Sequence, residues 1–268
     1  MIRLIVSDMD GTLLDSNEML PADFFEVLSE LNRRDIIFVV ASGRSYSTLC
    51  QNFSPMPSQL SYIAENGACV VENGIIIHQD TLDFNDVEEI ISVCSGIDDV
   101  YPLVCGTKGL HINPGPQWFV DENKKYYKDI FLFDSLSCVK DKVYKVGIFD
   151  RIGSSVNSYP VLSKAFGERL NVVTSGKHWT DVMKKGVNKG NALEIIQKRL
   201  NILPEETMVF GDFYNDIQML SKAKYSFIMG NACDDMKQYG NFIAKTNDEN
   251  GVMDAIREYV LDDTCEVI

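Results

Sequence analysis

Short apolar runs and helical repeats alternate along the first forty residues. Residues 1–7 form an apolar run of the kind found in strands that are buried on both faces. Behind Pro21, apolar side chains recur at the spacing of one helical face: Phe24, Val27, Leu28 and Leu31. This helix is expected to end near residues 33–34, and residues 36–41 make a second apolar run. The order strand, helix, strand predicts a βαβ unit of a parallel sheet.

Two further stretches of the chain are predicted to extend this sheet. Residues 62–64 form a strand that is followed by a turn at Asn66-Gly67 and a hairpin around Asn73-Gly74. In the last third, helices are predicted at 191–200, 216–223 and 252–261, and strands at 208–210, 227–229 and 242–244. We expect these strands to continue the same parallel sheet.

The pattern changes in the middle of the chain, where β-rich runs are separated by glycine and proline turns. We interpret this stretch as an insertion, which gives a core domain of residues 1–82 and 187–268 and an inserted domain of residues 83–186. The polar residues near 84–86 and 184–186 are the expected crossings. Two crossings would let one domain hinge on the other.

The chain is acidic, because 39 Asp and Glu against 25 Lys and Arg give its 268 residues a formal net charge of -14. Such a field disfavours nonspecific binding to nucleic acid or anionic lipid, and we expect neither as a partner. Apolar runs such as residues 36–41 are far shorter than the ~20 residues of a membrane span. Because the net charge of the chain is negative, a site for an anionic metabolite must gather positive charge locally, from a lysine, an arginine or a bound cation.

Seven cysteines, at positions 50, 69, 94, 105, 138, 233 and 265, contain no C-x-x-C pair and no even framework. We interpret them as core thiols of a reduced cytoplasm, because most lie in apolar runs. The amino terminus passes directly into an apolar strand, without the features of a secretory signal. A cytoplasmic location is therefore expected.

The strongest chemical signal is Asp8-Met9-Asp10-Gly11, where the first strand runs into a glycine turn. Ligands of open parallel sheets gather at that edge. Two carboxylates two residues apart lie on one side of a strand, and a cation or a proton relieves their repulsion. A Mg²⁺ ion suits such a site, because it takes oxygen ligands and keeps positions for water and phosphate. By itself, D-x-D-G is also a common turn or calcium-loop fragment.

Two further segments offer groups that bind anions. Ser42-Gly43-Arg44 follows the second strand and provides a hydroxyl and backbone N–H donors, although Ser42 could equally be a plain helix cap. Arg44 either clamps an anion or pairs with an acid on the surface. Lys189 precedes a helix, and a basic residue there is repelled by the positive end of the helix dipole. This placement is unfavourable unless an anion lies nearby. A solvated surface lysine is the alternative.

The last segment, residues 211–216, follows the strand at 208–210 and again carries carboxylates to the end of a strand. Asp212 and Asp216 are its acids. Alone, this segment could be a loop with a capping aspartate.

Taken together and in this order, these segments resemble the haloacid dehalogenase superfamily, and within it the Cof-type (subfamily IIB) sugar-phosphate phosphatases. The resemblance spans nearly the whole chain and includes similar segments at residues 64–68, 229–232 and 250–252. It implies an α/β fold with a Rossmann-like, doubly wound parallel sheet core and an inserted α/β cap of the C2B type. It also implies Mg²⁺ as cofactor and a small phosphorylated metabolite as partner. Because such a cap shuts out water, a monomer is the expected state.

The resemblance implies a role for each matching position. Asp8 would accept the phosphoryl group, and Asp10 would protonate the departing alcohol and then activate water. Ser42 and Lys189 would complete the catalytic set by stabilising charge on the phosphate. The implied phosphate-binding residues are Asp8, Met9, Asp10, Ser42, Gly43, Arg44, Lys189 and Asn215. The implied metal site comprises Asp8, the backbone carbonyl of Asp10, and Asp212, with Asn215 and Asp216 in support.

One segment departs from the family pattern. Many relatives have asparagine after the aspartate of the fourth motif, whereas Phe213 and Tyr214 stand here. These residues change the local polarity near the expected substrate site, which allows an altered substrate preference. Residues 178–181 lie near the expected return from cap to core, although a histidine beside a tryptophan is more often a packing residue.

Three functions remain open on the sequence. The first is a Mg²⁺-dependent phosphatase of small metabolites, sugar phosphates above all, that works through an aspartyl-phosphate. The second is a phosphomutase or phosphotransferase, because the same intermediate could pass its phosphoryl group to a sugar hydroxyl. The third is a non-catalytic, metabolite-sensing protein, which the complete set of catalytic side chains disfavours.

Overall fold

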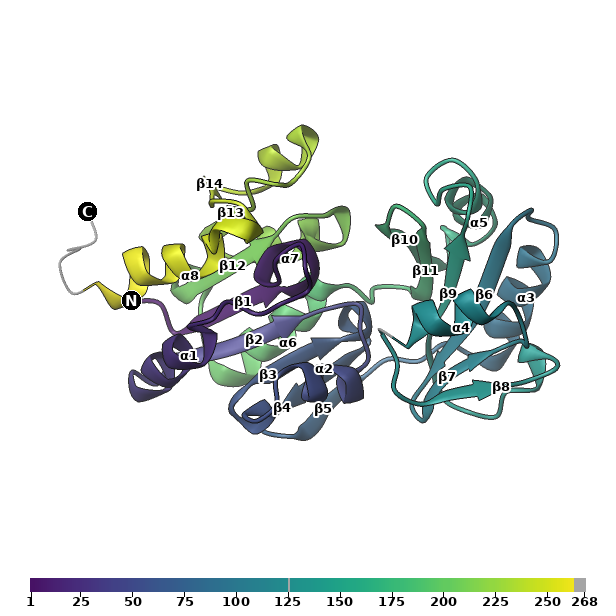
Figure 1. The fold of residues 1–268 in the computed structure, drawn as a ribbon, viewed down its shortest axis with the longest axis horizontal. Helices are drawn as coiled ribbons and strands as arrows, with labels where there is room; N and C mark the ends of the chain where they lie inside the picture. Colours follow the sequence, from purple (N-terminus) through teal and green to yellow (C-terminus); the bar gives the residue numbers. More distant parts are fainter. Residues whose placement is uncertain (125, 263–268) are drawn as a thin grey trace.

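The larger of two β-sheets has β1 near its centre (Figure 1). The computed structural model describes residues 1–124 and 126–262. This sheet has eight strands in the order β14-β13-β12-β1-β2-β3-β4-β5. Their bounds are β1 Leu4–Asp8, β2 Ile37–Ala41, β3 Ser61–Ala64, β4 Cys69–Glu72, β5 Ile75–Gln79, β12 Thr207–Gly211, β13 Tyr225–Ile228 and β14 Phe242–Ile243. Neighbours from β14 to β3 pair in parallel, whereas β3, β4 and β5 pair antiparallel.

Helices cover both faces of this sheet. Ile5 of β1 belongs to the apolar cluster under α1, α2 and α8, whereas Leu4 and Val6 belong to the cluster under α6 and α7. The helices are α1 Phe24–Arg33, α2 Tyr46–Asn52, α6 Lys189–Leu200, α7 Ile217–Leu220 and α8 Gly251–Ile256, which continues as a π-helical turn over Arg257–Leu261. Burial on both faces explains why β1 is a continuous apolar run. We call this sheet with its helices the larger lobe.

The amino-terminal elements match their sequence pattern. All four apolar residues predicted to face the core from the first helix are buried: Phe24, Val27, Leu28 and Leu31. The predicted hairpin joins β4 to β5 through Asn73 and Gly74, whose φ angles are 51° and 76°. Two successive positive φ values suit the right-handed twist of a two-residue hairpin loop, which explains the Asn-Gly pair.

Two carboxy-terminal helices begin or end elsewhere than predicted. α6 begins at Lys189 rather than at residue 191, because the side chain of Asn188 accepts a hydrogen bond from the N–H of Asn191 and caps the helix. α7 spans only Ile217–Leu220, since a 3₁₀ turn over Tyr214–Asp216 precedes it. The prediction of a helix over 216–223 was therefore too long.

The second sheet is mainly antiparallel and has the order β10-β11-β9-β6-β7-β8. Its strands are β6 Val100–Gly106, β7 Gly109–Ile112, β8 Ile130–Leu132, β9 Val143–Asp150, β10 Leu170–Gly176 and β11 Trp179–Lys184. On one face of this sheet, α3 (Phe84–Cys94) and α5 (Ser158–Phe166) contribute to an apolar core. On the other face, α4 (Gln117–Asn123) contributes to a second core. We call this sheet with α3, α4 and α5 the smaller lobe, which lies beside the larger lobe in Figure 1.

Residues 84–86, predicted to be a crossing, form the first turn of α3 instead of an irregular linker. The chain enters the smaller lobe after β5 and leaves it after β11 at Lys184. Where the two domains divide remains our interpretation.

The cysteines only partly fit their predicted place in the core. Cys69, Cys94 and Cys105 are buried as free thiols, but Cys138 and Cys233 are exposed. Cys265 lies outside the described residues. Among the helices of residues 1–124 and 126–262, none is both long and apolar enough to cross a bilayer.

Candidate active site

The parallel registers of the larger sheet bring the predicted motifs to one edge. Asp8 is the last residue of β1 and pairs with Ala41 at the end of β2, so that Ser42 follows beside it. β12 pairs with β1 on the other side and ends at Gly211, directly before Asp212. Open parallel sheets bind ligands at this edge, where the carboxyl ends of the strands meet.

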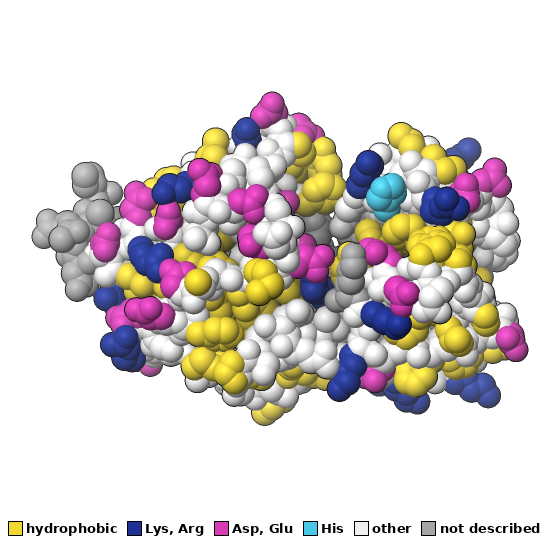
Figure 2. Space-filling model, in the orientation of Figure 1, with side chains coloured by type: hydrophobic (Ala, Val, Ile, Leu, Met, Phe, Trp, Pro, Cys, Tyr) yellow, Lys and Arg dark blue, Asp and Glu magenta, His cyan; other side chains and the backbone are white. Residues whose placement is uncertain are grey.

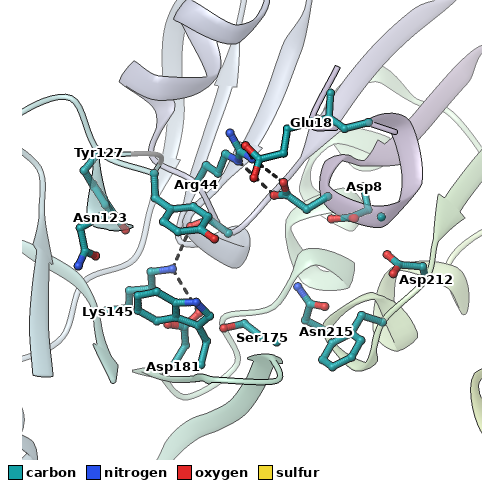
Figure 3. Close-up of a pocket in the computed structure, with 18 of the residues that line it drawn as sticks. Asp8, Glu18, Arg44, Asn123, Tyr127, Lys145, Ser175, Asp181, Asp212 and Asn215 are labelled. Atoms are coloured by element: carbon teal, nitrogen blue, oxygen red, sulfur yellow. Dashed lines mark hydrogen bonds and ion pairs between the residues drawn. The ribbon is translucent and has the colours of Figure 1, made fainter. Parts of the chain in front are cut away.

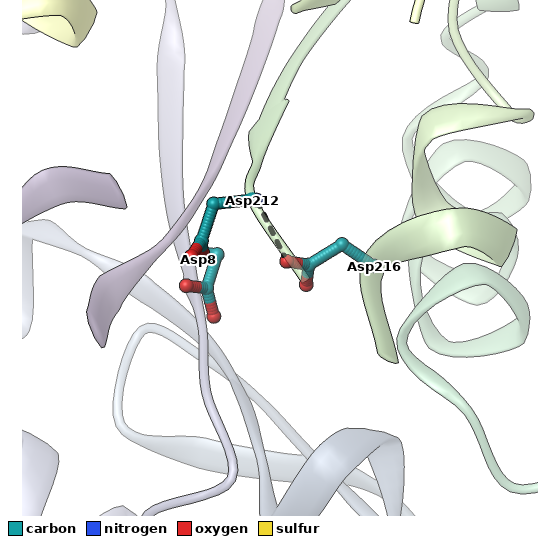
Figure 4. A group of neighbouring side chains, drawn as sticks. All are labelled: Asp8, Asp212 and Asp216. Atoms are coloured by element: carbon teal, nitrogen blue, oxygen red, sulfur yellow. Dashed lines mark hydrogen bonds between the residues drawn. The ribbon is translucent and has the colours of Figure 1, made fainter. Parts of the chain in front are cut away.

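Three carboxylates gather at this edge (Figure 4). Asp8, Asp212 and Asp216 each offer a ligand atom, and these atoms lie within 4.8 Å of one another. The Thr12 hydroxyl donates to Oδ1 of Asp212 at 2.9 Å. Oδ2 of Asp216 accepts the backbone N–H groups of Asp212 at 3.1 Å and Phe213 at 3.2 Å, which fixes the loop. A group of hard oxygen ligands at this spacing fits a small divalent cation.

Lys189 places an ammonium group against this carboxylate group. Its side chain is fully buried, and Nζ donates to Asp8 and to Oδ1 of Asp216, the latter at 2.7 Å. Burial alone would lower the pKa of Lys189, but the carboxylates of Asp216 and Asp8 outweigh it and hold the pKa above its ordinary value. Lys189 is therefore a permanent cation beside Asp8.

One lysine does not neutralise three carboxylates. Burial raises the pKa of Asp8 well above the usual range, Asp216 raises it further, and Lys189 opposes this only in part. Burial and Asp216 likewise raise the pKa of Asp212 to about 7, against the hydrogen bond from Thr12. A bound cation would offset the burial and the mutual repulsion that raise these pKa values, so the group suits a metal ion.

Arg44 pairs with an acid, which is one of its two predicted roles, but its guanidinium is buried and does not lie on the surface. It is buried and donates from Nε to Oδ2 of Asp10 at 3.1 Å and from Nη2 to Oδ1 at 2.5 Å. Glu18 lies 3.9 Å from the same Nη2, and the ring of Tyr126 lies 5.5 Å from the guanidinium carbon. The side chain of Asp10 is thus bound by Arg44 and does not belong to the group of three carboxylates.

The other predicted phosphate-binding residues are distributed around Asp8. Ser42 is buried, and its Oγ accepts the N–H of Arg44 at 3.1 Å. The side chain of Met9 is packed in the core, so that only its backbone could contact a phosphate. Asn215 lies outside the carboxylate group and donates its amide to Oδ1 of Asn66 at 3.1 Å. Gly43 lines the cleft described next.

A cleft of about 400 Å³ opens above these groups, between the two lobes (Figure 3). Asp8, Asp10, Arg44, Asp212 and Asn215 line it from the larger lobe. The smaller lobe and the loops of the same insertion supply its other wall: Leu103, Asn123, Tyr126, Tyr127, Lys145, Ser175, Gly176, Trp179 and Asp181. A pocket of this size accommodates a small metabolite.

The residues of this second wall were mostly missed from the sequence. The one weak signal was the segment 178–181. Trp179 and Asp181 do reach the cleft, because alternate residues of β11 share a face. His178 points elsewhere: its Nδ1 lies 2.8 Å from the carbonyl of Asp150, and it lines a separate hollow with Trp118.

Lys145 joins the two lobes through a buried polar network. Its Nζ donates to the carbonyl of Gly43 at 2.9 Å and to Oδ2 of Asp181 at 3.2 Å, and Oε2 of Glu65 lies 3.5 Å away. Oδ2 of Asp181 also accepts from Nδ2 of Asn66 at 2.6 Å. Burial would lower the pKa of Lys145, but Asp181 and Glu65 raise it above its ordinary value, so this ammonium stays charged.

A sequence model of the haloacid dehalogenase-like hydrolases matches residues 5–256. The chain belongs to this haloacid dehalogenase-like family. It is 29% identical, over 95% of each chain, to the 5-amino-6-(5-phospho-D-ribitylamino)uracil phosphatase YbjI of Escherichia coli. The solved structure of SMU.1108c from Streptococcus mutans has a TM-score of 0.93 and 31% identity, covering 98% of this chain and 100% of that one.

The fold is shared more widely within the family. The subclass IIB sugar phosphatase BT4131 has a TM-score of 0.83 at 22% identity, covering 96% of this chain and 98% of its own. These comparisons confirm the predicted family, the α/β fold class and the enzyme class of phosphatase.

Proposed function

We propose that this haloacid dehalogenase-like enzyme hydrolyses phosphate monoesters of small metabolites, sugar phosphates above all, through an aspartyl-phosphate on Asp8 and with Mg²⁺. The observation that carries this proposal is the placement of Asp8 at the cleft, between the ammonium of Lys189 and the carboxylate of Asp212. A phosphate beside Asp8 would meet a fixed cation there. The relative YbjI is named for a phosphatase reaction on a phosphorylated polyol derivative, which supports the substrate class.

The chain's own residues account for both steps. An Oδ of Asp8 attacks phosphorus while the P–O bond to the substrate breaks, and Asp10 gives its proton to the departing oxygen. Asp10 then takes a proton from water, whose oxygen attacks phosphorus and releases Asp8. Lys189 stabilises charge on the phosphoryl oxygens, and Ser42 can donate a hydrogen bond to one of them.

The carboxylates fit Mg²⁺, with Asp8, Asp212 and the backbone carbonyl of Asp10 as the proposed ligands and Asn215 and Asp216 in support. When bound, the ion would neutralise charge on the phosphate and on the clustered acids. The elevated pKa of Asp212, at about 7, is consistent with this assignment, since burial and the neighbouring Asp216 penalise its ionised form and a bound cation would offset both.

We further propose that residues 83–186 act as a cap over the core formed by the rest of the chain, in a cytoplasmic monomer. The cleft between the lobes would keep water from the phosphoryl group until the leaving group departs. Contacts such as Lys145 to Gly43 support closure of this kind, because they cross from one lobe to the other.

Asp8→Asn tests the proposal most directly. Purified wild type is expected to release phosphate from p-nitrophenyl phosphate with Mg²⁺ and to lose this activity when a chelator is added. The Asp8→Asn enzyme is expected to be inactive, whereas Asp35→Asn, which changes an exposed acid remote from the cleft, should retain activity. Unchanged turnover by Asp8→Asn would exclude Asp8 as the nucleophile.

A further inference from the structure

The basic side chains that line the cleft are both occupied by acids. Arg44 is bound by Asp10 through two hydrogen bonds and lies 3.9 Å from Glu18. Lys145 is shared between Asp181 and Glu65. Within residues 1–124 and 126–262, the cleft wall therefore offers no arginine or lysine without an acidic partner.

Acids, by contrast, are abundant in the same cleft. Beyond the group at Asp8, its lining includes Asp10, Asp15, Glu18 and Asp181 (Figure 3). Acidic side chains also lie on both sides of the gap between the lobes in Figure 2. These four acids outnumber the two bases that line the cleft, so a second anionic group on a substrate would meet net repulsion and would find no unpaired cation among the lining residues.

Asp181 lines the cleft with a side chain that is 4% exposed, and only one of its two oxygens is bound by the described residues. Its Oδ2 accepts from Asn66 and from Lys145, whereas Oδ1 has no hydrogen-bond partner in the described part of the chain. The side chain lines the cleft on the smaller lobe, opposite the phosphate-binding edge. A carboxylate in this state accepts hydrogen bonds from hydroxyl or amino groups and cannot donate one.

We propose that the cleft selects monophosphates whose leaving group carries hydroxyl or amino donors and no second anionic group, with Oδ1 of Asp181 accepting from one such donor. This inference rests on the proposed phosphatase function and specifies its substrate class. Asp181 is then a specificity residue, because it contacts the leaving group and takes no part in the transfer of phosphorus.

Two substrates that differ at a single carbon test the selection. Sorbitol 6-phosphate ends in a CH₂OH group at C1, where 6-phosphogluconate carries a carboxylate. The kcat/KM of wild type for the acid is expected to be at least about tenfold lower than for the polyol. Equal or faster hydrolysis of 6-phosphogluconate would overturn the inference, and this comparison needs no variant.

Asp181→Asn removes the charge and keeps the shape and an acceptor oxygen. This variant is expected to lower the ratio of kcat/KM for sorbitol 6-phosphate to kcat/KM for 6-phosphogluconate, mainly through a lower KM for 6-phosphogluconate. Asp99→Asn is the matched control on the smaller lobe, because Asp99 is exposed, does not line the cleft and has a φ of 55° that asparagine tolerates. An unchanged ratio in a folded Asp181→Asn enzyme contradicts the role of Asp181.

Hydrolysis of p-nitrophenyl phosphate separates this inference from the proposed function. Its leaving group carries no second anionic group, so a phosphatase of this kind should turn it over with Mg²⁺. Absence of that activity contradicts the proposed function, whereas its presence together with a preference for 6-phosphogluconate contradicts only the selection by charge.

Discussion

Arg44 holds Asp10 in a two-pronged ion pair, with hydrogen bonds of 3.1 Å from Nε and 2.5 Å from Nη2. The exposures of the two partners are unequal: the side chain of Arg44 is 4% exposed, and that of Asp10 is 48% exposed. A buried, rigid cation thus fixes a carboxylate that faces the cleft. Because a guanidinium fork sets both distance and direction, Arg44 fixes the position of the carboxylate that is proposed to exchange protons with the leaving oxygen and with water.

Arg44→Lys keeps the charge and removes the fork, so Asp10 should lose its orientation. We expect kcat for an alkyl phosphate to fall about tenfold to a hundredfold, because a poorly placed acid protonates the leaving oxygen less effectively. The loss for p-nitrophenyl phosphate should be smaller, since nitrophenolate departs readily without a proton. Steady-state kinetics with both substrates provides the measurement.

Equal losses for the two substrates would instead indicate that Arg44 binds the phosphate. Arg34→Lys offers a matched control: Arg34 also carries a guanidinium bound to a carboxylate, that of Glu30, but it lies outside the cleft. That variant should leave both rates unchanged.

Lys189→Met is expected to damage stability as well as activity. The change leaves Asp8 and Asp216 buried without their cation, and uncompensated buried charges typically cost about 3–5 kcal/mol. Urea denaturation without metal should show this loss in the free energy of unfolding. Added Mg²⁺ should recover part of it, because the ion restores positive charge beside the carboxylates. A urea midpoint equal to that of wild type would contradict the role of Lys189 in neutralising the buried carboxylates.

The larger lobe could be predicted from the sequence because its signals are local. Apolar runs that end in acids or small polar residues mark β1, β2 and β12, and the rules of parallel sheets place those ends together. Asp8, Ser42 and Asp212 could thus be brought to one edge before any coordinates were known.

The wall formed by the smaller lobe could not be predicted in the same way. Lys145 and Asp181 lie on β9 and β11, 36 residues apart, and they meet only because these strands pair antiparallel in a particular register. A shift of one strand by one residue would place the two side chains on opposite faces of the sheet. Glu65 lies in the segment 64–68 that resembles the family, but the sequence assigned it no partner, since its contact with Tyr127 depends on how the lobes pack.

Metal binding should release protons, and more of them at low pH. The pKa of Asp212 is raised to about 7, so without metal this carboxyl is largely protonated at pH 6 and ionised well above 7. A divalent cation requires the ionised form, so the affinity for Mg²⁺ should fall as the pH drops through 7. Calorimetric titrations in buffers of different ionisation enthalpy would count the protons. Equal release at pH 6 and pH 8.5 would contradict the assignment of Asp212.

Gly11 and Gly74 allow a comparison that separates backbone strain from damage to the metal site. Their φ angles are nearly equal, 79° and 76°, so alanine strains both backbones alike, by about 1 kcal/mol. A Cβ at Gly11 would lie 2.6 Å from Oδ2 of Asp212, whereas one at Gly74 meets no atom within 4 Å. Gly11→Ala should therefore displace Asp212 and weaken Mg²⁺ binding and turnover at least about tenfold, while Gly74→Ala loses only stability. Equal activity of the two variants would show that Asp212 is not held where the metal needs it.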